Sequence, residues 1–228
     1  MKRSKMLERR RENAVQEKEE LLKDIESPEP LKINMLQYHS SRLVNIKNLS
    51  IRYPDSDTPL FSGLSMEIRS GSRIALSGKN GCGKSSLIRL ILGENIPYTG
   101  EISIASGLRI SYVSQDTSHL HGTLSEYALR CGVDAPLLLT VLDKLGLERP
   151  QFEKRIETYS EGQKKKVLLA RSLCEPAHLF VWDEPLNYID IFSRIQLEDL
   201  LLASQPSMLF VEHDRTFREK IATEIIEL

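Results

Sequence analysis

The chain has 228 residues, of which 40% are apolar and 28% are charged, and its formal net charge is −1. This length and composition favour one full globular domain with an appendage, and they argue against fibrous and largely disordered classes. No apolar run approaches the roughly 18 residues of a membrane-spanning helix, and the Arg-rich start lacks a secretory signal, so we expect a cytoplasmic protein without stable membrane insertion. The three cysteines, Cys82, Cys131 and Cys174, are widely spaced, so we predict neither a disulfide framework nor a zinc site.

The first 26 residues predict a charged helix. Residues 1–12 carry six Lys or Arg against two Glu, a local charge of +4. Leu7, Ala14 and Leu21 recur every seven residues in a stretch without Gly or Pro, which indicates a helix with one narrow apolar stripe. Such a helix buries little by itself, so we expect it to pack on a partner outside this chain or to fray. Its basic start is typical of a solvated helix face and also suits a polyanion. A Ser-Pro-Glu-Pro sequence then ends it.

Alternating apolar residues predict the first strands of the main domain. The segment 43–53 alternates with period two except for a phase slip at residues 47–48, which predicts a strand with a bulge. A second strand over 64–68 and a third over 73–77 follow. We expect these strands to belong to one mixed sheet.

Helices and strands alternate through the rest of the chain. We predict helices at 84–92, 161–174, 189–203 and 214–222, and two more that begin after Thr123 and Asp134. The remaining predicted strands lie at 101–104, 108–113, 178–182, 207–212 and 223–228. This alternation predicts an α/β protein with a parallel core.

A glycine-rich loop lies between the strand 73–77 and the helix 84–92. Its sequence, Gly78-Lys79-Asn80-Gly81-Cys82-Gly83-Lys84-Ser85, fits the pattern GxxxxGK[ST] in the context that the motif requires, which disfavours a plain glycine turn. Without a Cβ, the glycines let backbone N–H groups of the loop and the following helix point at phosphate oxygens. We expect these residues and Ser86 to bind a nucleotide, with Lys84 on the β- and γ-phosphates and Ser85 on Mg²⁺.

An apolar strand that ends in two carboxylates, Asp183 and Glu184, lies about a hundred residues after this loop. We expect Asp183 to hold Mg²⁺ through its water shell and Glu184 to polarise the attacking water as a general base. Such a strand end is common by itself. After a glycine loop, it predicts a nucleotide hydrolase.

A third motif, Tyr159-Ser160-Glu161-Gly162-Gln163, resembles the LSGGQ signature of ABC ATPases, and the resemblance covers roughly residues 42–228. Ser160, Gly162 and Gln163 open a helix and so form an anion site, but a compact domain cannot bring this site and the glycine loop to one γ-phosphate. In the family, the signature of one domain completes the nucleotide site of another, with ATP between them. The resemblance therefore implies an ATPase that is active only with a second ABC domain, in the same full-length chain or as a homodimer.

Single residues in the family's order strengthen this resemblance. Tyr53 corresponds to the aromatic residue that stacks on adenine, Gln115 to the Q-loop glutamine and His213 to the switch histidine, and residues 187–190 correspond to the D-loop. Taken individually, they are also typical of a strand-end aromatic, a polar loop residue and a surface histidine. The resemblance implies the catalytic residues Glu184, His213 and Gln115 and the Mg²⁺ ligands Ser85, Gln115 and Asp183.

The resemblance also implies a domain organisation. It predicts a P-loop NTPase fold of the ABC type, in which a parallel α/β core carries an antiparallel β subdomain and a small helical subdomain at about 120–175. Residues 42–228 would form the ABC domain and residues 31–41 a connector. Residues 1–30 would be a charged helix at the tail of an interdomain linker.

Two segments are similar to the ABC-F subfamily, whose members carry two ABC domains and no membrane domain. Residues 212–217 resemble its HDRxF sequence, and residues 184–190 resemble its EPTNHLD sequence in the form of ribosome-protecting, antibiotic-resistance members. The resemblance implies a translation factor that clamps on the ribosome and contacts rRNA and tRNA. Two other classes stay open: the ATPase subunit of an ABC membrane transporter and a non-catalytic ATP-binding module.

Two features of the signature helix lead to separate expectations. Glu161 replaces a glycine of the signature, and its carboxylate would weaken closure on a γ-phosphate unless it points away. Lys164, Lys165 and Lys166 follow the signature, and we expect them on a solvated face, with contact to rRNA as the alternative.

Overall fold

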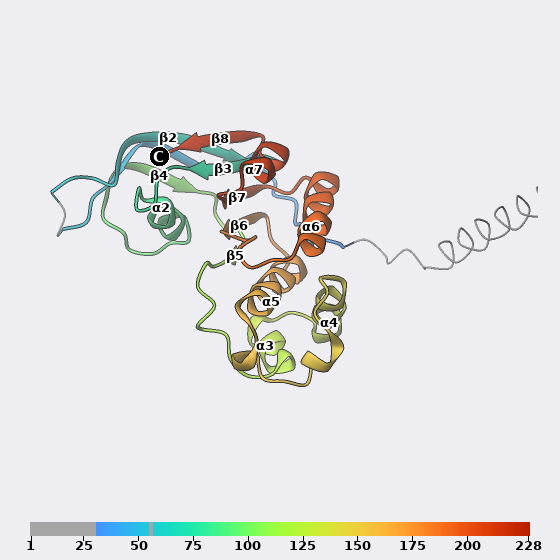
Figure 1. The fold of residues 1–228 in the computed structure, drawn as a ribbon. Coiled ribbons are helices and arrows are strands. Elements are labelled where there is room, and N and C mark those ends of the chain that lie inside the picture. Colours follow the sequence, from blue (N-terminus) through green and yellow to red (C-terminus); the bar gives the residue numbers. More distant parts are fainter. Residues whose placement is uncertain (1–30, 55–56) are drawn as a thin grey trace, which may run out of the picture. The chain divides into compact units, whose positions relative to one another are not determined.

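The computed structural model describes residues 31–54 and 57–228, so the helix predicted over 1–26 lies outside the described residues. The described residues form a three-stranded antiparallel sheet, a five-stranded parallel sheet and the helices around them (Figure 1). The predicted α/β fold class is confirmed.

The antiparallel sheet has the strand order β2-β1-β4. Its register shifts between Ile46 and Leu49, where Asn48 has a φ of 47°, so the predicted slip is a β-bulge. The strands are β1 (Arg42–Ile51), β2 (Phe61–Arg69) and β4 (Tyr98–Ile104).

The parallel sheet has the strand order β5-β6-β7-β3-β8. Its strands are β3 (Arg73–Ser77), β5 (Ile110–Val113), β6 (Leu179–Asp183), β7 (Met208–Val211) and β8 (Glu224–Glu227). The prediction of one mixed sheet for the first three strands is wrong, because β3 pairs with β7 and β8 instead of β2. The apolar centre of β3 is fully buried, as expected of a strand inside a parallel sheet.

Each of the six α-helices in the described part of the chain begins after a capping residue or after the glycine loop. Thr123 and Ser160 each form a capping box, and Asp134, Asp190 and Asp214 accept a backbone N–H with their side chains. The described helices are α2 (Lys84–Ile91), α3 (Leu124–Cys131), α4 (Ala135–Lys144), α5 (Glu161–Cys174), α6 (Ile191–Ser204) and α7 (Arg215–Ile221), with short 3₁₀ turns at Arg149–Gln151 and Ile156–Thr158.

Strand β6 separates two hydrophobic clusters. Phe180 and Trp182 belong to the cluster built with the helices, whereas Leu179 and Val181 belong to the cluster shared with the antiparallel sheet and α2. This division follows from the alternation of side chains along a strand. The start of the predicted connector packs on the helical side, where Leu31 is buried, whereas Tyr38 packs against the other cluster. Both clusters therefore fix β6, the strand that ends in the two predicted catalytic carboxylates.

Gly100 lies opposite the bulge of β1 and provides a test of this packing. It has a φ of +97°, and a Cβ there would overlap the carbonyl oxygen of Asn48. Gly107 also has a positive φ, +71°, but nothing lies within 4 Å of its Cβ position. We expect Gly100→Ala to lower the free energy of unfolding by about 2–4 kcal/mol and Gly107→Ala by about 1 kcal/mol. Urea unfolding measures both, and equal losses would contradict the steric constraint.

Candidate functional site

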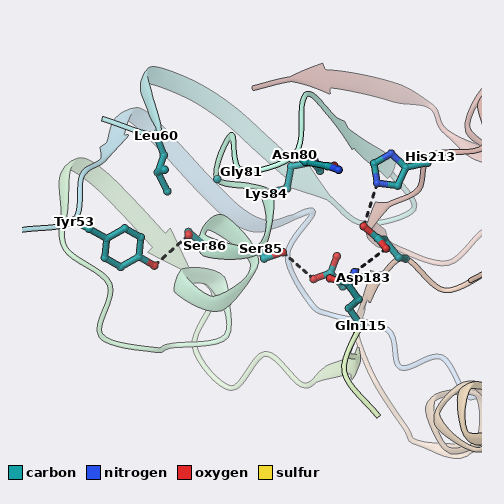
Figure 2. A pocket seen from close by; sticks show the side chains of 12 residues that line it. Tyr53, Leu60, Asn80, Gly81, Lys84, Ser85, Ser86, Gln115, Asp183 and His213 are labelled. Carbon is teal, nitrogen blue, oxygen red and sulfur yellow. Dashed lines mark hydrogen bonds and ion pairs between the residues drawn. The ribbon is translucent and has the colours of Figure 1, made fainter. Parts of the chain in front are cut away.

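A cleft of about 650 Å³ lies between the glycine loop and the carboxyl ends of the parallel strands. Figure 2 shows Tyr53 and His213 toward opposite ends of this cleft. Gly78, Lys79 and Cys82 belong to the loop but do not line the cleft. The lining residues are Tyr53, Leu60, Asn80, Gly81, Gly83, Lys84, Ser85, Ser86, Gln115, Asp183, Glu184 and His213.

Lys84 is the first residue of α2 and is buried at the base of the loop. Its ammonium donates hydrogen bonds to the carbonyl oxygens of Gly78, at 2.9 Å, and Lys79, at 3.0 Å. These bonds hold the charge at a helix N-terminus, where the backbone dipoles also favour an anion. At the far end of the cleft, the hydroxyls of Tyr53 and Ser86 lie 3.1 Å apart.

Asp183 and Ser85 form a polar pair in the cleft that suits a divalent cation. The Ser85 hydroxyl donates to Oδ2 of Asp183 at 3.2 Å, and Asp183 is almost completely buried. Burial raises the pKa of this carboxyl, since the charged form loses its hydration, and a divalent cation would supply the compensating charge. A hydroxyl, a carboxylate and the free amide oxygen of Gln115 are ligands that Mg²⁺ prefers.

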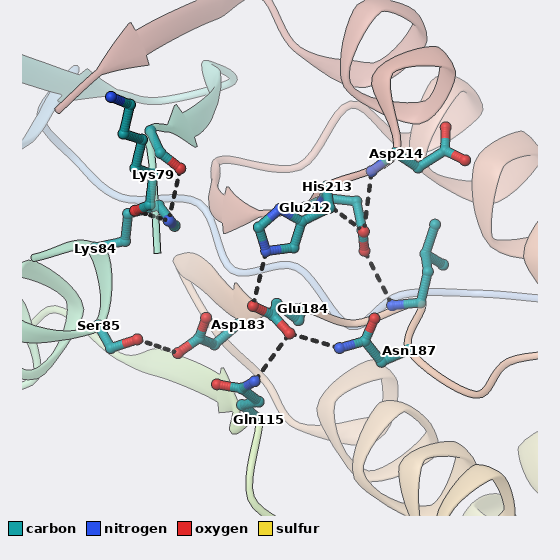
Figure 3. Close-up of polar contacts among 12 residues, drawn as sticks. Lys79, Lys84, Ser85, Gln115, Asp183, Glu184, Asn187, Glu212, His213 and Asp214 are labelled. Atoms are coloured by element: carbon teal, nitrogen blue, oxygen red, sulfur yellow. Dashed lines mark hydrogen bonds and ion pairs between the residues drawn. The ribbon is translucent and has the colours of Figure 1, made fainter. Parts of the chain in front are cut away.

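Side chains from three loops contact the Glu184 carboxylate (Figure 3). Oε2 accepts hydrogen bonds from the amide groups of Gln115, at 2.9 Å, and Asn187, at 2.5 Å. Nε2 of His213 lies 3.1 Å from Oε1. Both oxygens are thus fixed in position, as a general base requires.

Glu212 joins two of these loops and was not among the predicted site residues. It is buried after β7, and its Oε1 accepts from the backbone N–H groups of His213, at 2.8 Å, and Asp214, at 3.3 Å. Its Oε2 accepts from the N–H of Leu186 at 3.2 Å. In the sequence, Glu212 is only the first residue of the segment 212–217 that resembles an ABC-F motif. Leu60 also escaped prediction, because an apolar residue before a strand is expected in any core.

The signature residues do not line the cleft, in agreement with the expectation that one domain cannot bring both anion sites together. Ser160 and Gln163 cap each other, and their side chains and backbone N–H groups exchange hydrogen bonds at 3.0 and 3.3 Å. The Glu161 carboxylate accepts from the Thr117 hydroxyl at 2.6 Å and from the Lys164 ammonium at 3.0 Å. These contacts lower the pKa of Glu161 and hold its charge beside the loop that follows Gln115.

The expectation of a solvated lysine face on α5 is wrong for Lys165 and Lys166, and so is the alternative of contact with rRNA. Lys165 is 2% exposed and Lys166 is 9% exposed. Helix α5 packs against β5 and α4, and the long aliphatic stems let both ammonium groups reach polar partners inside. Lys166 forms an ion pair with Asp190 at 2.6 Å. Burial lowers the pKa of Lys165 to about 8.

The fold and this cleft define a P-loop nucleotide-binding domain. The family model described as ABC transporter matches residues 61–187, so the chain belongs to the ABC transporter family. This membership implies nucleotide binding and confirms the prediction of an ABC-type ATPase domain. None of the helices in the described part of the chain has the length and apolar character that a membrane crossing requires.

The curated relatives include members of the F family, as the sequence motifs predict. The chain is 30% identical over 216 residues to the ATP-binding protein Uup of Buchnera aphidicola, and this match covers 91% of this chain and 36% of that protein. It is 29% identical over 192 residues to ABC transporter F family member 2 of Arabidopsis thaliana, and this match covers 82% of this chain and 28% of that protein. The chain therefore spans about a third of the length of these relatives.

A solved structure supports the fold. A bacterial ABC transporter cassette, solved as a dimer, superposes with a TM-score of 0.70 at 19% identity, covering 82% of this chain and 94% of that chain. The ABC-type fold predicted from the motifs is confirmed by this likeness.

Gly162 provides a test of the contact between the signature and residue 188. A Cβ at Gly162 would lie 2.5 Å from the carbonyl oxygen of Tyr188. Alanine at a helical glycine normally adds about 1 kcal/mol of stability. We expect Gly162→Ala to lower the free energy of unfolding by about 1–3 kcal/mol instead, because the backbone at Tyr188 must move. Thermal and urea unfolding measure this change, and a gain in stability would refute the contact.

Proposed function

We propose that this chain hydrolyses ATP when it pairs with a second ABC domain. The observation that carries the proposal is the Glu184 carboxylate, which lies next to the Ser85 and Asp183 pair and is contacted by Gln115 and His213. A fixed carboxylate beside a phosphate-binding loop is the arrangement that activates water for attack on a γ-phosphate.

Seven side chains of the cleft have a role in the proposed reaction. Lys84 exchanges its loop carbonyls for the β- and γ-phosphates, and Tyr53 stacks on the adenine. Glu184 accepts the proton of the attacking water, while Gln115 and His213 keep its carboxylate in place. Ser85, Asp183 and Gln115 would hold Mg²⁺, which neutralises phosphate charge when it is bound.

The second domain supplies the missing anion site. Ser160, Gly162 and Gln163 lie at the N-terminus of α5, where the helix dipole favours an anion, but they lie outside the chain's own cleft. In the proposed pair, this signature contacts the γ-phosphate held by the other domain. ATP then stabilises the closed pair, and hydrolysis opens it.

We further propose that the full-length protein is an ABC-F translation factor in the cytoplasm that clamps on the ribosome, contacts rRNA and tRNA and protects the ribosome from antibiotics. The F-family relatives and the motifs at 184–190 and 212–217 support this role. The family description leaves a transporter ATPase as the competing function.

Substitution of Lys84 tests nucleotide binding directly. We expect Lys84→Ala to weaken ATP binding at least about tenfold, since a charge-assisted hydrogen bond to phosphate contributes about 1.5–3 kcal/mol. Titration with a fluorescent ATP analogue measures the affinity. The exposed Lys154 gives the control, and Lys154→Ala should bind like the wild type. Equal affinity of both variants would refute the role of Lys84.

Substitution of Glu184 tests the ribosome clamp. Glu184→Gln keeps the shape of the side chain but removes the base, so hydrolysis stops and the closed pair accumulates. We expect the full-length variant to co-sediment with ribosomes at least about tenfold more with ATP than without it, at physiological salt, where screening weakens non-specific charge attraction. ATP-dependent binding to membrane vesicles without ribosome binding would favour the transporter.

A further inference from the structure

Lys165 is a buried lysine that contacts the backbone behind the catalytic cleft. Its ammonium donates hydrogen bonds to the carbonyl oxygens of Ser114, at 2.9 Å, and Asp183, at 3.2 Å. It forms no direct ion pair with a carboxylate among the described residues. Burial of an ammonium without a bonded carboxylate is costly, so its two carbonyl contacts need an explanation beyond packing.

The two carbonyls belong to the residues directly before the proposed catalytic pair. Ser114 precedes Gln115, and Asp183 precedes Glu184. The side chains of Gln115 and Glu184 are themselves hydrogen bonded at 2.9 Å. One ammonium therefore fixes the backbone of both loops next to the residues that must stay in contact.

The backbone at Glu184 needs such support. Its φ is 49°, a left-handed conformation that costs a residue other than glycine about 1–3 kcal/mol and persists only when its surroundings hold it. Lys165 holds the carbonyl oxygen before Glu184, and Glu212 holds the N–H of Leu186 after it. The turn is thus held on both sides by buried charged side chains.

Lys165 also lies on the helix that begins at the signature. A cavity of about 220 Å³ separates the start of α5 from the catalytic loops and is lined by Gln115, Asp116, Thr117, Glu161, Lys165, Asn187 and Tyr188. Apolar side chains do not fill this space, so polar contacts such as those of Lys165 connect the signature helix to the catalytic loops. A shift of α5 would move the ammonium relative to Ser114 and Asp183.

We propose that Lys165 is a positioning residue that keeps Gln115 and Glu184 in register and links them to the signature helix. The proposal rests on the hydrolytic role of Glu184 proposed above. It explains why a lysine occurs inside α5 where an apolar residue would bury at lower cost.

The first test separates turnover from binding. We expect Lys165→Met to lower kcat for ATP hydrolysis at least about tenfold while KM changes less than about threefold, because the loops lose their alignment and the phosphate-binding residues stay intact. Lys165→Gln keeps an N–H donor and should recover part of kcat. Values of kcat within about twofold of the wild type for Lys165→Met would overturn the proposal.

The second test needs no hydrolysis. Hydrogen exchange of the nucleotide-free 228-residue chain should become faster at 114–117 and 183–188 in Lys165→Met. Lys166→Met is the matched control, because Lys166 is also buried on α5 but contacts Gly146 and Asp190. An increase at 114–117 and 183–188 that Lys166→Met reproduces, or no increase, would overturn the proposal. If the wild type does not hydrolyse ATP when paired, the proposed function fails, and this experiment still decides the role of Lys165.

Discussion

The end of strand β6 determines the chemistry of this domain. The strand is buried along its length and presents alternate side chains to two hydrophobic clusters, so it has no freedom to shift or rotate. In a continuing strand, Asp183 and Glu184 would point to opposite faces of the sheet. The left-handed backbone at Glu184 ends that alternation, and both carboxylates line the same cleft. The division of labour between a cation ligand and a base thus depends on one unfavourable backbone conformation.

Buried charges around this turn are held mainly by the backbone. Lys84 and Lys165 donate to carbonyl oxygens, while Glu212 accepts from N–H groups. Each of these charges is satisfied by peptide dipoles instead of a directly bonded counter-charge, which leaves Asp183 and Glu184 free to face the cleft. An opposite charge bonded to either carboxylate would compete with a cation or with a proton from water.

Local sequence signals could be read correctly from the chain. The spacing of the glycine loop and of the signature located α2 and α5, and the predicted helix 161–174 has the bounds of α5, because Ser160 and Gln163 form a capping box that fixes the start of the helix. The bulge in β1 was visible as a phase slip. The assignment of individual site residues and of the domain boundaries stays a prediction, since it depends on a ligand and on residues outside the described part.

Contacts between residues far apart in the sequence could not be predicted in the same way. Strand β3 takes its partners from β7 and β8, more than a hundred residues later, so no pattern near β3 separates it from β2. The lysines of α5 were predicted to be solvated because a charge pattern does not show that a long aliphatic side chain is buried and brings its ammonium group to polar partners inside the domain. The contact between Glu212 and the N–H of Leu186 could be predicted only if β6 and β7 were known to be neighbours, and the sequence does not show this pairing.

Trp182 is an intrinsic fluorescent probe next to the catalytic carboxylates. It is the single tryptophan of the chain, it precedes Asp183, and its indole N–H donates to the Ser172 hydroxyl on α5 at 2.9 Å. The emission of an indole depends on the polarity and hydrogen bonding of its immediate surroundings. All tryptophan fluorescence of this chain therefore originates between the signature helix and the catalytic carboxylates, so that the light it emits reports on the junction between the two.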